Sequence, residues 1–116
     1  MKKIRIGLAG CGFVSELHMV AYRRVYGVDV EVRAVAARGD HVNEFARKHQ
    51  IPNAYRSFAE LVADADIDVI DICTPPNLHA AMIVDAMNTQ PPRKFLSLNS
   101  ANWMNGRSVV SEWAKK

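Results

Sequence analysis

The chain has 116 residues, 49% of them hydrophobic, which is enough for one domain with one modest core. Its formal net charge is +3, and the charges are scattered rather than gathered in a basic stripe, so we expect no nucleic-acid partner. No apolar run approaches the roughly 18 residues of a membrane span, and the charged N-terminus lacks the apolar segment of a signal peptide, which predicts no membrane partner. Two cysteines are too few for a small secreted domain stapled by disulfides, which favours a cytoplasmic location.

The first forty residues predict a βαβ unit. An apolar, partly β-branched run over 4–9 is bounded by glycine and predicts a buried strand. Apolar residues then recur at helical spacing over 13–26, and Gly27 ends that helix. Residues 28–37 alternate at first and then become wholly apolar, as a central parallel strand does.

Two helices with capping residues come next, separated by a short extended piece. Asp40 is expected to cap a helix over 41–49. Ser57, with Glu60 three residues later, predicts a capping box at the start of the following helix.

The last part of the chain predicts two more strands. One covers 68–73 and stops at a Thr-Pro-Pro sequence, because proline cannot donate a hydrogen bond to a central ladder. A helix over 77–87 follows, then a strand at 94–98 and a short helix at 109–116. The alternation of strands and helices predicts an α/β fold, a Rossmann-type doubly wound parallel sheet. A full sheet of this type has six strands, so we expect one that is incomplete at its C-terminal edge, where exposed apolar surface favours self-association.

The turn at 10–15 reads G-x-G-x-x-S directly between a predicted strand and a predicted helix. In a dinucleotide-binding unit the first glycine permits the tight turn, and Gly12 lets the backbone approach a pyrophosphate at the helix N-terminus. The third position must be small for the helix to pack on the strand, and Ser15 departs there from Gly or Ala. The alternative is a glycine-rich turn that binds no ligand.

The end of the second predicted strand bears on the choice of cofactor. An acidic residue there holds the ribose 2′-OH of NAD, whereas an arginine suits the 2′-phosphate of NADP. Here Ala37 is followed by Arg38, with no acid at 36 or 37, so NADP is not repelled. Arg38 is then a phosphate ligand or a solvated residue beside a helix cap, and in a further alternative Asp40 reaches the ribose from the turn.

The segment TPPNLH at 74–79, after GLAGCGFVSELH at 7–18, resembles the glucose–fructose oxidoreductase/inositol dehydrogenase/MocA (Gfo/Idh/MocA) family over residues 3–88. The resemblance implies that 10–14 line the pyrophosphate, and that residues at 74–79 border the ribose and nicotinamide. His79 is then a pocket residue or a packing residue, and His18, at a position that the family often fills with histidine, is open to the same two interpretations. The expected cofactor-binding residues are Gly10, Cys11, Gly12, Phe13, Val14, Ala37, Arg38, Thr74, Pro75, Asn77 and His79. We expect no metal ligands, with Cys11 and Cys73 as buried neighbours at strand ends.

The resemblance ends near residue 88. The family's Glu-Lys-Pro motif, whose lysine is its usual catalytic residue, does not occur in the sequence. We therefore expect a dinucleotide-binding domain over 1–88 and an atypical tail over 89–116, as in a truncated or frameshifted reading frame. Catalytic residues are not expected in this chain alone.

The leading functional hypothesis is the NAD- or NADP-binding domain of an oxidoreductase that acts on CH–OH groups of sugars or polyols, as the resemblance implies. A stand-alone nucleotide-binding or regulatory module is the second hypothesis, and a remnant that binds no ligand is the third.

Overall fold

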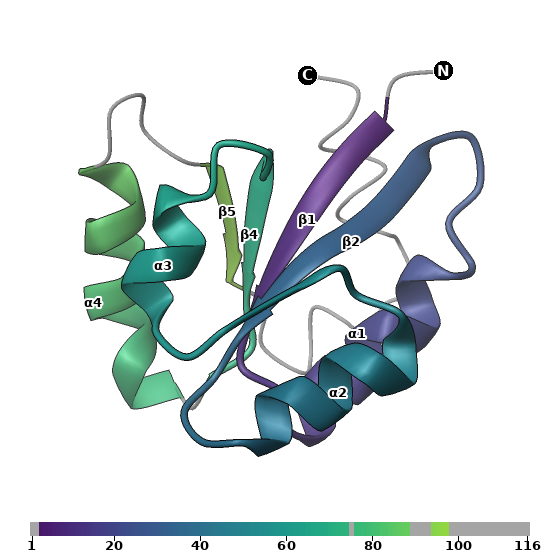
Figure 1. Cartoon of the computed structure of the whole chain (residues 1–116). Coiled ribbons are helices and arrows are strands. Elements are labelled where there is room, and N and C mark those ends of the chain that lie inside the picture. The colour runs from purple at the N-terminus through teal and green to yellow at the C-terminus, as the bar shows by residue number, and fades with distance from the viewer. Residues whose placement is uncertain (1–2, 75, 89–93, 98–116) are drawn as a thin grey trace.

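A computed structural model describes residues 3–74, 76–88 and 94–97 of the chain. They form one parallel sheet of five strands, in the order β3-β2-β1-β4-β5, with helices on both faces (Figure 1). The elements are β1 (Lys3–Ala9), α1 (Phe13–Tyr22), β2 (Asp29–Ala36), α2 (His41–His49), β3 (Asn53–Tyr55), α3 (Phe58–Ala63), β4 (Val69–Ile72), α4 (Pro76–Met87) and β5 (Lys94–Ser97). This is the predicted doubly wound order for five of its six strands, with β5 at the edge of the described sheet.

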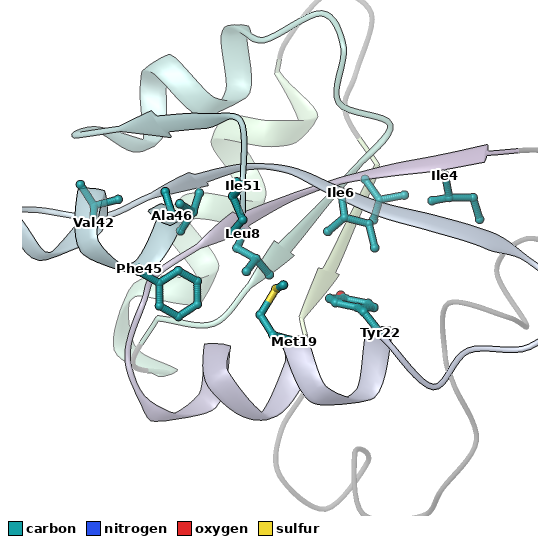
Figure 2. Packing of buried hydrophobic residues seen from close by; sticks show 11 residues of the cluster. Ile4, Ile6, Leu8, Met19, Tyr22, Val42, Phe45, Ala46 and Ile51 are labelled. Atoms are coloured by element: carbon teal, nitrogen blue, oxygen red, sulfur yellow. The ribbon is translucent and has the colours of Figure 1, made fainter. Parts of the chain in front are cut away.

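The two faces of the sheet hold separate cores. Figure 1 shows α1 and α2 over one face and α3 and α4 over the other. On the first face, Ile6 and Leu8 of β1 pack with Met19 of α1 and Phe45 of α2 (Figure 2). The second core joins β4 to α3, with Ile70 packing against Leu61. Burying apolar side chains on both faces of a parallel sheet is what gives its strands nearly continuous apolar sequences.

The carboxyl ends of the strands lie level with one another. Along the sheet, Tyr55 pairs with Ala36, Ala36 with Ala9, and Ala9 with Ile72. In open α/β sheets the ligand binds outside this edge, at the point where the strand order reverses. That point here lies between β1 and β4.

The first helix differs from its prediction in length and in the face that it buries. It ends at Tyr22 rather than at residue 26, because its buried stripe ends there and Tyr26 is 90% exposed. The buried residues are Ser15, His18, Met19 and Tyr22, while Phe13, Val14, Leu17 and Val20 are exposed. The apolar periodicity therefore predicted the helix but not the side that faces the sheet.

The two predicted caps have different outcomes. Ser57 caps α3 as expected, with its Oγ accepting from the backbone N–H of Glu60 at 3.2 Å. Asp40 is the N-cap residue of α2 as predicted, and its backbone carbonyl accepts from the Asn43 N–H at 3.1 Å, but its side chain makes no cap hydrogen bond and instead forms an ion pair with Arg56.

The other elements follow the predicted order within one or two residues at each end. The strand predicted at 94–98 is present as β5, which pairs with β4 in parallel. The short helix expected at 109–116 lies outside the described residues. Among those that are described, no helix is long and apolar enough to cross a membrane.

Candidate functional site

The turn after β1 is tied to both neighbouring strand ends. The backbone N–H of Gly10 donates to the Ala36 carbonyl at 2.7 Å, and that of Cys73 donates to the Ala9 carbonyl at 2.8 Å. Gly10 has a φ of +108°, and a Cβ added to it would lie 3.3 Å from the backbone carbonyl carbon and oxygen of Cys73. The fold itself therefore needs glycine at this position.

Gly12 has a different reason to be glycine. Its φ of −90° is open to any residue, and a Cβ built there would meet nothing within 4 Å. It directly precedes Phe13, the first residue of α1, so the free N–H groups of the first helical turn lie next to this open space. No contact within the described residues explains the glycine, and the space beside it is open.

Ser15 fits the third position of the turn by making a hydrogen bond. The side chain is fully buried, and its Oγ donates to the Gly10 carbonyl at 2.7 Å. The hydroxyl therefore fixes the turn onto the first helical turn, which accounts for the departure from Gly or Ala.

A cavity of about 440 Å³ opens at the carboxyl edge of the sheet. Four of the predicted cofactor-binding residues line it: Gly10, Ala37, Arg38 and Thr74. The other lining residues were not predicted: Ala9, Ala36, Arg56, Ser57, Phe58, Leu78, Ala81, Met82 and Asp85. The structure thus gathers residues from four strand ends, the start of α3 and α4 around one space.

The other predicted site residues are not among the described residues that line this cavity. Cys11 and Gly12 form the turn, and the side chains of Phe13 and Val14 are exposed at the start of α1. The backbones of Asn77 and His79 lie in the first turn of α4, and their side chains lie outside the described part of the structure, as does Pro75.

One wall of the cavity is basic because β2 and β3 end side by side. The Ala37 N–H donates to the Tyr55 carbonyl at 3.1 Å, so the residues that follow the two strands are neighbours. Arg38 follows β2 and Arg56 follows β3, and both line the cavity. Sequence reasoning missed Arg56, although an arginine directly after a strand that pairs with the second strand was a usable indication.

Helix α4 contributes a second, largely apolar wall. It is formed by Leu78, Ala81 and Met82, and Asp85 of the same helix adds a carboxylate to the lining. The Thr74 hydroxyl lies 3.2 Å from the sulfur of Met82, which links the end of β4 to this wall. A cavity lined by arginines and by apolar side chains suits a ligand with a flat ring and an anionic group.

A buried polar cluster joins α1 to β4 beneath the turn. The Asp71 carboxylate accepts from the Tyr22 hydroxyl at 2.5 Å through Oδ2, which also lies 2.6 Å from Nδ1 of His18. Nδ1 of His18 is in turn 3.2 Å from the sulfur of Cys73. His18 is 2% exposed and Asp71 is fully buried, so His18 is a packed residue of the helix.

The chemistry of this cluster favours hydrogen bonding over reactivity. Burial, with Asp71 nearby, raises the pKa of the Cys73 thiol and also that of Tyr22, so both groups keep their protons at neutral pH. Ligand atoms of His18, Asp71 and Cys73 all lie within 4.8 Å of one another, a grouping from which a metal site can be built. The separations of 2.6 Å and 3.2 Å are, however, those of hydrogen bonds. Both cysteines are partly rather than fully buried, which corrects the expectation for them.

Comparison with known proteins identifies the family of this chain and several relatives. Residues 4–93 match the family GFO_IDH_MocA, described as an oxidoreductase family with an NAD-binding Rossmann fold. Trans-1,2-dihydrobenzene-1,2-diol dehydrogenase of Danio rerio is 40% identical over 83 residues, which are 69% of this chain and 25% of that protein. A 4-carboxy-2-hydroxymuconate-6-semialdehyde dehydrogenase of Sphingobium is 29% identical over 109 residues, 94% of this chain and 34% of that protein.

Solved structures agree with the sequence relatives. Levoglucosan dehydrogenase in complex with NADH and L-sorbose superposes with a TM-score of 0.75 and 25% identity, over 84% of this chain and 27% of that one. An NAD-binding oxidoreductase from Klebsiella pneumoniae superposes with a TM-score of 0.74 and 29% identity, over 83% of this chain and 27% of that one. The chain therefore spans about a quarter to a third of the length of the proteins it matches.

Proposed function

Since this chain belongs to the Gfo/Idh/MocA oxidoreductase family through its NAD-binding Rossmann fold, we propose that its cavity and glycine turn bind a nicotinamide dinucleotide. The observation that carries the proposal is the position of Gly12. This residue borders open space at the N-terminus of α1, beside a cavity that joins Gly10, Arg38 and Thr74. A pyrophosphate needs close backbone approach and free helix N–H groups, and this turn offers both.

The cavity walls suggest how the ends of the cofactor would lie. The adenine ring would pack against the apolar wall of Leu78, Ala81 and Met82, with its ribose toward Ala37 and Arg38. The nicotinamide end would lie toward Thr74, with Pro75, Asn77 and His79 on the same segment. A bound nicotinamide supplies the hydride acceptor or donor, and the part of this chain is to bind and orient it.

We propose that NADP(H) binds at least as well as NAD(H). The end of β2 carries no acid at 36 or 37, and Arg38 lines the cavity. A guanidinium stabilises a phosphate monoester by paired, charge-assisted hydrogen bonds.

Titration of the purified chain with NADPH and with NADH, followed by nicotinamide fluorescence, tests this proposal. We expect NADPH to bind as tightly as NADH or more tightly. We also expect Arg38→Gln to weaken NADPH about tenfold, as loss of a charged hydrogen bond does. A large preference of the unaltered chain for NADH would reject the NADP assignment, and failure to bind either cofactor at millimolar concentration would reject dinucleotide binding.

The names of the relatives suggest a substrate class, which we propose for an enzyme that contains this domain. Levoglucosan dehydrogenase and dihydrobenzenediol dehydrogenase both carry names of substrates with CH–OH groups, which favours sugars or polyols. Proton transfer to or from such an alcohol needs an acid–base residue, and no lysine is found among the described residues that line the cavity.

A nucleotide-binding module without chemistry of its own is therefore the second candidate function. A dehydrogenase assay of this chain with sugar alcohols and aldoses separates the two. Turnover would support the enzyme, and cofactor binding without turnover would support the module.

A further inference from the structure

The basic wall of the cavity contains a second arginine, Arg56, whose place is set by strand pairing. Tyr55, the last residue of β3, pairs with Ala36, and its carbonyl accepts from the Ala37 N–H at 3.1 Å. Arg56 therefore lies next to the segment on which the proposed function places the adenosine ribose. Both Arg38 and Arg56 line the cavity there.

The guanidinium of Arg56 pairs with an acidic residue of the neighbouring turn, the one between β2 and α2. It forms an ion pair with Asp40, and the two side chains are 63% and 85% exposed. An exposed pair of this kind is weak, because water and salt screen it. Arg56 can therefore exchange this partner for a stronger anion without loss of a buried contact.

A phosphate monoester on the ribose is such an anion. It carries a charge of about −1.5 to −2 at neutral pH and accepts paired hydrogen bonds from a guanidinium. The carboxylate of Asp40 would repel the same phosphate as long as no cation neutralises it. Two anions can therefore pair with Arg56. One is the carboxylate of Asp40, which belongs to the protein, and the other is the phosphate, which belongs to the cofactor.

We infer that Arg56 is a second ligand for a 2′-phosphate on the adenosine ribose, and that Asp40 weakens this site by competing for Arg56. The inference rests on the proposed dinucleotide function and deepens it. It assigns discrimination between the two cofactors to the junction of β2 and β3 rather than to Arg38 alone. NAD(H), which lacks the 2′-phosphate, is insensitive to this pair.

The competing explanation is a surface ion pair that only orders the loops after β2 and β3. The two explanations predict different directions for the changes in cofactor affinity that two substitutions cause. If the pair only orders the loops, Arg56→Gln and Asp40→Asn should change the affinities for NADPH and NADH in the same direction. If Arg56 binds the phosphate and Asp40 competes for it, the two substitutions should change the NADPH affinity in opposite directions and leave the NADH affinity unchanged.

The test measures dissociation constants of the full 116-residue chain for NADPH and NADH at about 0.15 M salt, with 2′,5′-ADP and 5′-AMP as fragments that isolate the ribose phosphate. We expect Arg56→Gln to weaken NADPH and 2′,5′-ADP about tenfold and to change NADH and 5′-AMP less than twofold. Asp40→Asn should strengthen NADPH about threefold, and this gain should shrink in the Arg56→Gln background. Arg24→Gln, which removes one exposed positive charge outside the cavity, serves as the matched control.

The outcomes separate this inference from the proposed function. If Arg38→Gln weakens NADPH but Arg56→Gln does not, the dinucleotide site stands and the role of Arg56 is rejected. Equal losses for NADPH and NADH in Arg56→Gln would also reject it, in favour of loop ordering. If the unaltered chain strongly prefers NADH, the NADP assignment and the role of Arg56 both fail while dinucleotide binding stands, and failure to bind either cofactor rejects the dinucleotide function itself. Circular dichroism checks folding, and Arg56→Lys, which keeps the charge but loses the fork, should retain part of the NADPH affinity.

Discussion

Nδ1 of His18 lies 2.6 Å from Oδ2 of Asp71, and the two side chains, 53 residues apart in sequence, are buried between α1 and β4. The Tyr22 hydroxyl donates to the same carboxylate oxygen. The other oxygen, Oδ1, is buried without a hydrogen-bond partner among the described residues. The helix that carries the candidate pyrophosphate turn is therefore attached to the sheet partly by a polar contact with a central strand.

Asp71→Asn is expected to lower the free energy of unfolding by about 3 kcal/mol. The substitution removes the carboxylate that both Nδ1 of His18 and the Tyr22 hydroxyl contact, and a buried polar group that loses its partner costs about 1–3 kcal/mol. Urea denaturation followed by circular dichroism measures the change. The matched control is Asp29→Asn at the exposed start of β2, where we expect less than about 1 kcal/mol. Equal stability of Asp71→Asn and the unaltered chain would show that the cluster does not hold α1.

Gly10→Ala is expected to destabilise the fold by about 1–3 kcal/mol. The positive φ of +108° is unfavourable for alanine, and the new Cβ would press on the Cys73 backbone at 3.3 Å. Thermal unfolding measures the effect. A melting temperature unchanged from that of the unaltered chain would contradict the positive φ of this turn.

Gly12→Ala is expected to behave in the opposite way, with stability changed by less than about 1 kcal/mol and cofactor affinity reduced at least tenfold. A Cβ at this position meets nothing in the fold, but it would occupy the space that the proposed pyrophosphate needs. Thermal unfolding and NADPH titration of the same sample give both quantities. Unchanged affinity in the stable variant would move the pyrophosphate away from this turn.

Glu16→Gln is expected to remove a small, pH-dependent part of the stability. The carboxylate lies 3.0 Å from Nζ of Lys48 and 2.9 Å from Nε2 of His49, so it ties α1 to α2. Burial acts to raise the pKa of Glu16, but these two partners outweigh it, and the pKa lies below its ordinary value of 4.5.

Because the folded chain holds the charged form of Glu16 more tightly, its contribution is complete above pH 4.5 and is lost as the pH falls through the lowered pKa. The variant should be less stable than the unaltered chain at pH 7, by less than about 1 kcal/mol, because the Glu16 side chain is partly exposed and Lys48 is largely so. The two stabilities should converge in acid. Urea denaturation between pH 3 and pH 7 checks this, and a constant difference would contradict it.

Cys73 is expected to react slowly with alkylating reagents in the folded chain. Burial raises the pKa of its thiol, and the thiolate is the reactive form. In a Cys11→Ser variant, iodoacetamide at pH 8 should label Cys73 at least about tenfold more slowly in the native state than in urea. Equal rates in the two states would show that the end of β4 is open to solvent.

Local chemistry in the sequence determined the order of elements and the turn. The helical spacing of apolar residues, the Ser57 cap and the strand-ending prolines each act within a few residues of themselves. They predicted the alternation of strands and helices, and with it the doubly wound sheet. Gly10 and Gly12 could be read in the same way, because the turn and the helix that follows are local structures.

Only the tertiary structure decided which residues meet. The apolar spacing of Phe13 and Leu17 marked a helix, yet these residues are exposed and His18 is buried, because its partner Asp71 comes from a strand far along the chain. Arg56 reached the cavity through the register of β2 with β3. Pairing between distant strands depends on the packing of the whole sheet, and no local pattern in the sequence records it.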